Sequence, residues 1–415
     1  MKITVIGGGS TYTPELVDGF ARLGFPVEEI ALVDPDADRL AVIAPLARRI
    51  LARQGHPAAV TASADPDAGI DGADAVLFQL RIGGQDARHI DETLPHACGC
   101  IGQETTGAGG LAKALRTVPV VLDLAERVAE RAPQAWIVDF ANPVGIVTRA
   151  LLDAGHRAVG LCNVAIGFQR TFADWLGVDH SRITLDHVGL NHLTWERSVL
   201  LDGVDVLPQL LDEHGQALAE RLHMPLDVVR RLGVIPSYYL RYYYAHDEVL
   251  AEQLVTPSRA EEVAGMERDL LKLYADPGLD EKPALLDKRG GAYYSEAAVQ
   301  LVHALTADTG EVRVANVRNN GTLPFLSDDA VIEVPSRVGA HGATPLPVAP
   351  VEPLFAGLIA HVSAYEELAL EAALHGGVER VSDALLAHPL IGQIDTAEQL
   401  ARKLVAANRQ HLRWA

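Results

Sequence analysis

Short apolar runs alternate with longer segments of helical spacing through the first 165 residues of the chain. The segments at 13–24 and 37–55 repeat apolar residues with helical periodicity and end at glycine. Continuous apolar strands joined by amphipathic helices are typical of a parallel sheet covered by helices on both faces. We therefore predict an α/β domain over residues 1–165. Its predicted strands are KITVIG (2–7), EIALVD (29–34), DAVLFQL (74–80), AWIVDFA (135–141) and RAVGLC (157–162).

The pattern changes after residue 165. Residues 181–203 and 312–338 read as longer, partly alternating strands, and the chain is mainly helical from Val351 onward. The Pro-rich stretch ATPLPVAPVEP (343–353) reads as a connector. Residues 166–415 are therefore predicted to form a second domain of the α+β class.

Charge and cysteine content limit the class of protein. The 415 residues carry a formal net charge of −20, which argues against nucleic acid and anionic membranes as partners. No stretch approaches the roughly 18 apolar residues of a membrane-spanning helix, and the first residues lack the profile of a signal peptide. The three cysteines cannot form a disulfide framework, and two of them, Cys98 and Cys100, read as packing residues. We therefore expect a cytoplasmic protein.

The turn after the first predicted strand, IGGGSTYTPEL (6–16), has the composition of a phosphate-binding turn. Its glycines permit a tight turn and a close approach of the backbone, and Pro14 suits the first turn of a helix. The free N–H groups at the start of such a helix can hold a pyrophosphate. Tyr12 stands where the usual third glycine would be, so a purely structural turn is the alternative. The residues expected to contact a dinucleotide here are Gly7, Gly9, Ser10 and Thr11.

Asp34 supports the dinucleotide interpretation. It ends the second predicted strand, where an acidic residue commonly bonds the ribose hydroxyls of a dinucleotide. Because its carboxylate would repel a 2′-phosphate, NAD is favoured over NADP. The alternative is that Asp34 only caps the turn ahead of Pro35.

A cysteine and a histidine stand out in the middle of the chain. Cys162 lies in LCNVAIGFQR (161–170), and His192 lies in GLNHLTW (189–195). One interpretation is that Cys162 is a small hydrophobic residue at the end of a buried strand. The other is that Cys162 and His192 hold a metal ion, for which a thiolate and an imidazole would suggest zinc.

The chain resembles glycoside hydrolase family 4, in particular its 6-phospho-β-glucosidase branch, which departs from the two-carboxylate chemistry of most glycosidases. The resemblance runs almost end to end, and its specificity comes from many segments in the right order. It implies a Rossmann-type sheet domain followed by an α+β domain like the C-terminal domain of lactate and malate dehydrogenases. The segments are GGGSTYTPEL (7–16), RIGGQDAR (81–88), GQETTGAGGLAKALRTVPV (102–120), FANPVGIVT (140–148), GLCNVAIG (160–167), VGLNH (188–192), IPSYYLRYYY (235–244), KRGGAYYSEAA (288–298) and DDAVIEVPS (328–336).

The resemblance implies that Cys162 and His192 bind a divalent metal, usually manganese, which also contacts sugar hydroxyls. It further implies a redox-assisted elimination with NAD⁺ as a recycled cofactor. Hydride leaves the sugar C3, a base removes the acidified C2 proton, the aglycone leaves C1, water adds, and hydride returns. The metal would polarise the C3 carbonyl and the C2 oxygen.

By position in the family the base is Tyr239. Tyrosine is a poor base at its usual pKa near 10, so the adjacent cation would have to favour the phenolate. The neighbouring tyrosines of the run are competitors, although most of such a run is expected to pack a helix face. They are Tyr238, Tyr242, Tyr243 and Tyr244.

The leaving-group acid and the groups that bind the substrate are also implied by the resemblance. Family members acting on α-linked substrates carry an Asp after the metal-binding Cys, whereas this chain has Asn163, which favours the β-linked branch. Asn163 would then orient sugar hydroxyls. Glu104 resembles the acid candidate of β-active relatives, and the alternative is a carboxylate that caps a helix start.

A phosphate on the substrate would be bound by Arg88, Asn142 and Arg289, since guanidinium groups bond two phosphate oxygens at once. Surface salt bridges are the alternative for the arginines. The resemblance and the apolar segment 353–374 also predict a homodimer or a homotetramer.

A competing interpretation is an NAD-dependent 2-hydroxyacid dehydrogenase of the same architecture. Such an enzyme needs a His–Asp pair and an arginine for the substrate carboxylate, and it has no use for a Cys–His metal site. A non-catalytic NAD-binding sensor is a third, weaker interpretation. The pair Cys162 and His192 favours the glycosidase.

Overall fold

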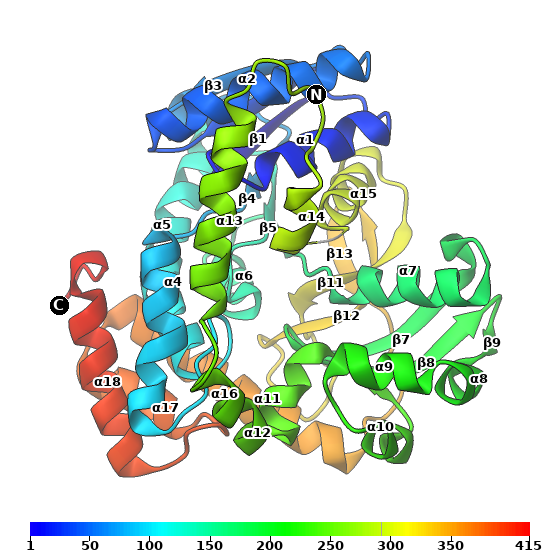
Figure 1. Cartoon of the computed structure of the whole chain (residues 1–415), viewed down its shortest axis with the longest axis vertical. Coiled ribbons are helices and arrows are strands. Elements are labelled where there is room, and N and C mark those ends of the chain that lie inside the picture. The colour runs from blue at the N-terminus through cyan, green and yellow to red at the C-terminus, as the bar shows by residue number, and fades with distance from the viewer. Residues whose placement is uncertain (292) are drawn as a thin grey trace.

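The computed structural model describes residues 1–291 and 293–415 and contains two sheets (Figure 1). The larger sheet has nine strands in the order β13-β12-β11-β6-β5-β4-β1-β2-β3. Its parallel part consists of β1 (Lys2–Ile6), β2 (Glu29–Val33), β3 (Ala59–Ser63), β4 (Ala75–Phe78), β5 (Trp136–Asp139) and β6 (Ala158–Gly160). The order 3-2-1-4-5-6 is that of a doubly wound dinucleotide-binding domain. All five predicted strands are confirmed, each shorter than predicted by one to three residues.

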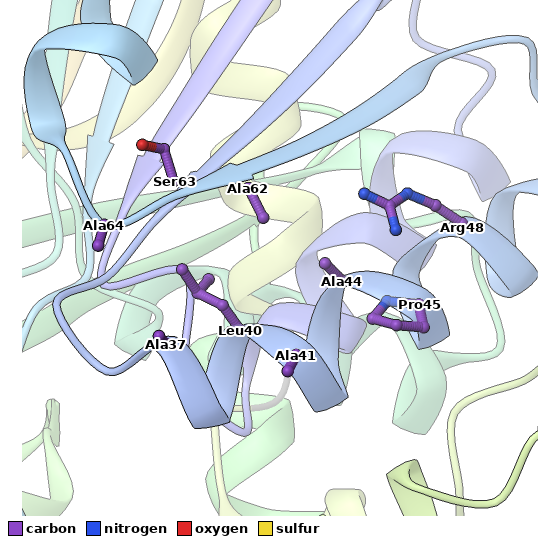
Figure 2. A pocket seen from close by; sticks show the side chains of 9 residues that line it. All are labelled: Ala37, Leu40, Ala41, Ala44, Pro45, Arg48, Ala62, Ser63 and Ala64. Atoms are coloured by element: carbon purple, nitrogen blue, oxygen red, sulfur yellow. The ribbon is translucent and has the colours of Figure 1, made fainter.

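Strand β3 was not predicted, and its sequence gives the reason. Along AVTAS only Val60 is buried, so the segment lacks the continuous apolar run of the other strands. It forms the edge of the sheet, where one side needs no cover. A hollow of about 290 Å³ lies between β3 and helix α2, lined mainly by small apolar side chains and by Arg48 (Figure 2).

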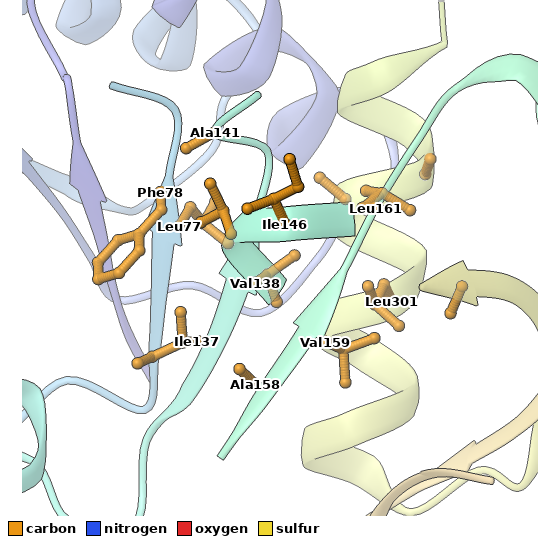
Figure 3. Packing of buried hydrophobic residues seen from close by; sticks show 14 of the residues in the cluster. Leu77, Phe78, Ile137, Val138, Ala141, Ile146, Ala158, Val159, Leu161 and Leu301 are labelled. Atoms are coloured by element: carbon orange, nitrogen blue, oxygen red, sulfur yellow. The ribbon is translucent and has the colours of Figure 1, made fainter. Parts of the chain in front are cut away.

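Helices cover both faces of the parallel sheet, as predicted. The helices of the first 176 residues are α1 (Thr13–Arg22), α2 (Ala37–Arg53), α3 (Pro66–Ile70), α4 (Gly84–Thr93), η1 (Leu94–Cys98), α5 (Gly107–Arg131), α6 (Val144–Asp153) and α7 (Val164–Leu176). Of these, α4 packs on α5, and α7 packs on the second sheet described below. Ile137 and Val138 point to opposite faces of β5, and both are at most 1% exposed. Figure 3 shows them among the side chains of β4 and β6, with Ile146 of α6 and Leu301 of α15 (Tyr294–Ala307).

Three strands from the second half of the chain extend the same sheet. They are β11 (Glu311–Arg318), β12 (Val331–Gly339) and β13 (Gly342–Pro345), all antiparallel to their neighbours. β11 joins β6 through the pair Asn316 and Gly160. A side chain at Gly160 would lie 2.8 Å from the Asn316 Cβ, so the close approach requires glycine there. The domain boundary at residue 165 stays a prediction, since one sheet runs through both halves of the chain.

The remaining strands form a second, antiparallel sheet, which confirms the strands predicted at 181–203. It consists of β7 (Ile183–Leu190), β8 (Leu193–Leu201), β9 (Val204–Asp205) and β10 (Ile235–Pro236). The helices of this region are η2 (His180–Arg182), α8 (Leu207–Glu213), α9 (Gly215–Leu222), α10 (Leu226–Leu232), η3 (Tyr238–Leu240), α11 (Arg241–Tyr244), α12 (His246–Gln253), α13 (Arg259–Tyr274) and α14 (Leu285–Arg289).

The C-terminal region is helical, as predicted. It contains α16 (Pro353–His375), α17 (Val378–Leu386), α18 (Ile394–Asn408) and η4 (Arg409–His411), and α16 packs against α5 and α6 of the first half. The connector prediction for 343–353 is wrong at its start, because residues 343–345 pair with β12 as part of β13. Within residues 1–291 and 293–415, no helix is long and apolar enough to cross a membrane.

Candidate functional site

The glycine turn lies at the carboxyl end of β1, where the sheet order reverses between β2 and β4. Gly7 has a positive φ of 88°, and a side chain there would lie 2.9 Å from the backbone of Leu80. Helix α1 begins at Thr13, and no side chain caps it. The turn therefore presents a glycine-lined helix N-terminus at the switch point of the sheet, which fits a pyrophosphate.

Asp34 follows β2 and contacts this turn. Its Oδ2 accepts a hydrogen bond of 2.9 Å from the Gly9 backbone, and a side chain at Gly9 would lie 2.7 Å from its Cγ. Its Oδ1 accepts a bond of 3.0 Å from the backbone of Asp36, so the capping interaction considered as an alternative is also present. The structure thus brings Gly7, Gly9 and Asp34 together.

Ser10 and Thr11 complete the turn, but their side chains make hydrogen bonds to other groups of the protein. The Ser10 hydroxyl accepts a bond of 3.2 Å from the backbone of Tyr12. Thr11 is fully buried, and its hydroxyl donates to the Glu267 carboxylate at 3.2 Å. Any contribution of Thr11 to dinucleotide binding would therefore come from its backbone.

Cys162 lies two residues beyond β6 and two residues before the first residue of helix α7. Burial raises the pKa of its thiol well above the usual range, and the nearby Glu333 carboxylate adds to that rise. Hydrogen bonds from the Val164 backbone, the Asn191 side chain and the Asn163 backbone act in the opposite direction. The sulfur therefore sits among three donors that would support a thiolate once a cation is beside it.

His192 lies in the two-residue turn between β7 and β8, with a left-handed φ of 64°. Its ring is buried and stacks on the ring of Tyr239, with 3.7 Å between centroids and 8° between planes. Its Nδ1 lies 2.9 Å from the Thr105 hydroxyl. Burial lowers the pKa of His192 to about 4, so the imidazole is neutral, which is the form that binds metals.

Tyr239 links the two candidate ligands. Besides its stack on His192, its hydroxyl lies close enough to Cys162 for a thiolate there to raise the phenol pKa, although burial is the larger cause. Two other tyrosines of the run, Tyr238 and Tyr242, contact the Tyr239 ring at 6.0 and 6.3 Å between centroids, and Tyr242 belongs to a small core with Ile101 and Val249. Tyr243 stacks on His388. Tyr294, which was not predicted as a site residue, is partly buried and lies near Cys162 and Tyr239 as well.

The donor set at this point fits a catalytic metal ion. Within the described part of the chain, no group of three or more His, Cys, Asp or Glu side chains gathers to enclose a cation. Cys162 and His192 would therefore be two protein ligands, with the other positions left to substrate oxygens and water.

Glu104 lies at the centre of a buried group of cations. Its carboxylate pairs with Arg81, with Arg88 at 3.2 Å and with Lys113 at 2.7 Å. Burial alone would raise the pKa of Glu104, but these cations outweigh it and hold the pKa well below the usual range. These cations favour the ionised carboxylate, and the acid role of Glu104 stays a prediction. Glu104 does not cap the helix, because the side chain of Gln103 accepts the backbone hydrogen bonds at this turn.

The two arginines predicted to bind phosphate are not surface residues. Arg88 and Arg289 are only 11% and 16% exposed, and each pairs with a glutamate: Arg88 with Glu92 at 2.7 Å and Arg289 with Glu267 at 3.0 Å. Arg289 lies near enough to Arg81 and Arg88 for their charges to contribute to lowering its pKa, for which burial is the main cause. Arg81 was not predicted as a site residue, although it is the first residue of the segment RIGGQDAR (81–88).

Asn142 and Asn163 lie at the carboxyl ends of neighbouring strands, β5 and β6. The Asn142 Oδ1 is buried and has no hydrogen-bond partner among the described residues, which suits contact with a bound ligand. Asn163 borders a cavity of about 300 Å³ that begins next to Cys162. Its lining residues are Asn163, Val164, Gly167, Phe168, Arg221, Leu222, Tyr238 and Tyr293.

We predict that Glu104→Gln destabilises the fold by about 3–5 kcal/mol, because it leaves the buried Lys113 and the partly buried Arg81 and Arg88 without their shared counter-ion. Because the folded pKa of Glu104 is lowered, its stabilising effect is fully present above the usual glutamate pKa and is lost as the pH falls from there through the lowered folded pKa. Denaturant unfolding at neutral and acidic pH checks both points. The matched control Glu398→Gln removes an exposed pair with Arg402 and should cost less than about 1 kcal/mol. Equal losses in the two variants would contradict the prediction.

Comparison with known proteins gives matches along almost the whole chain. The profile of "Family 4 glycosyl hydrolase" matches residues 2–178, and that of the "Family 4 glycosyl hydrolase C-terminal domain" matches 187–391. A probable 6-phospho-beta-glucosidase of Bacillus subtilis is 38% identical over 99% of this chain and 97% of its own length. The 6-phospho-beta-glucosidase of Escherichia coli is 36% identical over 100% of this chain and 96% of its own.

Solved structures give the same result. The 6-phospho-beta glucosidase of Thermotoga maritima, solved with manganese, NAD⁺ and glucose-6-phosphate, superposes with a TM-score of 0.93 at 33% identity over 99% of each chain. Malate dehydrogenase from Salinibacter ruber, at 18% identity and a TM-score of 0.53 over 92% of this chain and 99% of its own, shares the fold alone. The predicted fold class is confirmed. The chain belongs to glycosyl hydrolase family 4.

Proposed function

We propose that this chain hydrolyses 6-phospho-β-glucosides with NAD⁺ and a divalent cation, Mn²⁺, bound. The observation that carries the proposal is that Tyr239 stacks on His192 and also lies near Cys162, which follows β6. Relatives that cover the whole chain are named for this activity, and one of them was solved with manganese, NAD⁺ and glucose-6-phosphate. When bound, the dinucleotide and the metal would supply transient oxidation of the sugar at C3 and acidification of the C2 hydrogen.

The dinucleotide would be held by the glycine turn and Asp34. Gly7 and Gly9 let the backbone approach a pyrophosphate, and the N-terminus of α1, with the backbone of Ser10 and Thr11, would face its charge. Asp34 would accept bonds from the ribose hydroxyls and repel a 2′-phosphate, so NAD is preferred to NADP.

The metal would be held by the Cys162 sulfur and a ring nitrogen of His192. A buried thiol loses its proton when a cation binds, so metal binding should release a proton. The substrate phosphate would lie toward Arg88 and Arg289, with Asn142 as a further donor, and Asn163 would orient sugar hydroxyls. The cavity beside Asn163 offers space for the aglycone.

We assign Glu104 an electrostatic role besides the acid role predicted from the sequence. Its carboxylate holds Arg81, Arg88 and Lys113 in one group, so the positive charge that attracts the phosphate is kept in place.

Tyr239 is the proposed base for the C2 proton. Its ring lies flat against one candidate metal ligand and its hydroxyl lies near the other, so a bound cation would stabilise the phenolate. None of the four neighbouring tyrosines stacks on a metal ligand among the described residues.

The site does not contain the pair of catalytic residues that the competing dehydrogenase function would need. A 2-hydroxyacid dehydrogenase needs a histidine paired with a carboxylate, whereas the Nδ1 of His192 meets the Thr105 hydroxyl. His187 does pair with Glu196 and Glu333, but it is fully buried and cannot reach a substrate. The likeness to malate dehydrogenase therefore concerns the fold.

We expect release of p-nitrophenol from p-nitrophenyl-β-glucoside 6-phosphate only when NAD⁺ and Mn²⁺ are both present. Cys162→Ser should weaken Mn²⁺ binding by more than about 100-fold, since even changes outside the ligand shell cost 10–100-fold. NAD⁺ binding and thermal stability should stay near wild type. The control is Cys98→Ser, which alters a free, partly buried thiol in η1 and should leave metal binding unchanged. Wild-type Mn²⁺ affinity in Cys162→Ser would reject the ligand assignment.

Tyr239→Phe should still bind NAD⁺ and Mn²⁺, because the phenol is a ligand to neither. Loss of a general base costs roughly 10²- to 10⁴-fold in rate, about 3–5 kcal/mol of barrier. Exchange of the substrate C2 hydrogen with D₂O, followed by NMR, should slow by that factor. Tyr243→Phe, on the same segment but stacked on His388, should exchange at the wild-type rate. Unchanged exchange in Tyr239→Phe would exclude Tyr239 as the base.

We also propose that the chain forms a homodimer or a homotetramer. Large apolar side chains are exposed on and beside α16, among them Leu354 at 60% and Leu374 at 42% exposure. Covering such residues in an interface stabilises association. Light scattering at micromolar concentration should give two or four times the mass of the chain. A single-chain mass would exclude an oligomer held by this surface.

A cytoplasmic location is proposed on the state of the cysteines. Cys98, Cys100 and Cys162 are all free thiols. Free thiols persist in a reducing compartment, and the metal site proposed above needs the Cys162 thiol unoxidised.

A further inference from the structure

We propose that Thr105 and Gln103 are positioning residues that set the tautomer of His192, so that Nδ1 carries the proton and Nε2 is free for the metal. The proposal rests on the assignment of His192 as a metal ligand. Neither residue is needed to hold the dinucleotide or the substrate in the function described above.

Three side chains form a short chain of hydrogen bonds. The Thr105 Oγ1 lies 2.9 Å from His192 Nδ1 and 2.8 Å from Gln103 Oε1. The Gln103 atom must be the amide oxygen, because backbone N–H groups of Thr105 and Thr106 also point at it, the latter at 2.8 Å. A backbone N–H can only donate, so the orientation of the amide follows from the backbone.

The direction of each bond follows from the number of protons available. A threonine hydroxyl has one proton, and the amide oxygen of Gln103 has none. Because two oxygens 2.8 Å apart attract each other only with a proton between them, the Thr105 hydroxyl donates to Gln103 Oε1 even though that oxygen also accepts two backbone N–H groups. The Thr105 oxygen is then left as an acceptor toward His192, so Nδ1 must carry the N–H. A neutral imidazole has a single N–H, so Nε2 keeps its lone pair.

Other contacts fix the position of the His192 ring, so the ring cannot turn to offer its other nitrogen to the cation. The face of His192 lies against Tyr239 at 3.7 Å, which fixes the ring plane. Thr105 and Gln103 lie in the turn that precedes the long, largely buried helix α5, so the hydroxyl is held by the fold. With the ring plane and Nδ1 both fixed, only Nε2 can bind the cation. Partners of this kind typically change metal affinity by 10–100-fold.

The test compares Thr105→Val, which keeps the shape but removes the hydroxyl, with Thr105→Ser, which keeps the hydroxyl. The first measurement is the Mn²⁺ dissociation constant, from the EPR signal of free Mn²⁺. We expect Thr105→Val to bind 10–100-fold more weakly than wild type and Thr105→Ser to bind within about threefold of it. Thr117→Val is the control, since its buried hydroxyl on α5 has no hydrogen-bond partner among the described residues. Its affinity should not change.

The second measurement reads the tautomer directly, without metal. In protein labelled with ¹⁵N-histidine, the wild type and Thr105→Ser should show protonated Nδ1 at His192, identified by loss of its signals in His192→Gln. Thr105→Val should show a mixture of tautomers or protonated Nε2. Protonated Nε2 in the wild type would overturn the proposal even if no variant folds. So would wild-type Mn²⁺ affinity together with an unchanged tautomer in Thr105→Val. If the wild type has the expected tautomer but binds no Mn²⁺, the metal function fails and the hydrogen-bond chain stands.

Discussion

A single buried carboxylate, that of Glu333, joins the two sheets beside the candidate metal ligands. Its Oε1 accepts from His187 Nε2 at 3.0 Å, and its Oε2 accepts from Asn191 at 2.9 Å and from Asn316 at 3.0 Å. Burial alone would lower the pKa of His187, but Glu196 and Glu333 raise it to about 10, so the ring is an imidazolium between two carboxylates. A charged group buried in this way is tolerated only when every partner is in place.

The hydrogen bonds of Glu333 help to position the two candidate metal ligands, Cys162 and His192. Glu333 belongs to β12 of the nine-stranded sheet, whereas Asn191 precedes His192 in the turn of the second sheet. Asn191 in turn bonds the Cys162 sulfur at the end of β6. One carboxylate therefore fixes the turn that carries one candidate ligand and the side chain that supports the other. The glycine turn follows β1, which belongs to the same nine-stranded sheet as Glu333. The dinucleotide and the metal would therefore both be bound beside this sheet.

The fold could be predicted from local patterns in the sequence, because buried parallel strands are apolar on both faces. Strand β3 escaped prediction since it lies at the sheet edge with only Val60 buried. Likewise the start of the connector pairs as β13 only because β12 is beside it. Cys162, His192 and Tyr239 were named through the family resemblance, and the structure places them together. Contacts between distant segments, such as Thr105 with His192 or Glu104 with Arg81, depend on the whole fold and leave no local pattern.

The central claim is that Cys162 and His192 together hold the divalent cation on which the activity depends. A crystal grown with Mn²⁺, NAD⁺ and glucose-6-phosphate would test it through the anomalous scattering of manganese. We predict one strong peak within bonding distance of both the Cys162 Sγ and the His192 Nε2, with sugar oxygens completing the coordination. A peak bound only to carboxylates such as Glu104 or Glu267, or no peak beside Cys162, would contradict it.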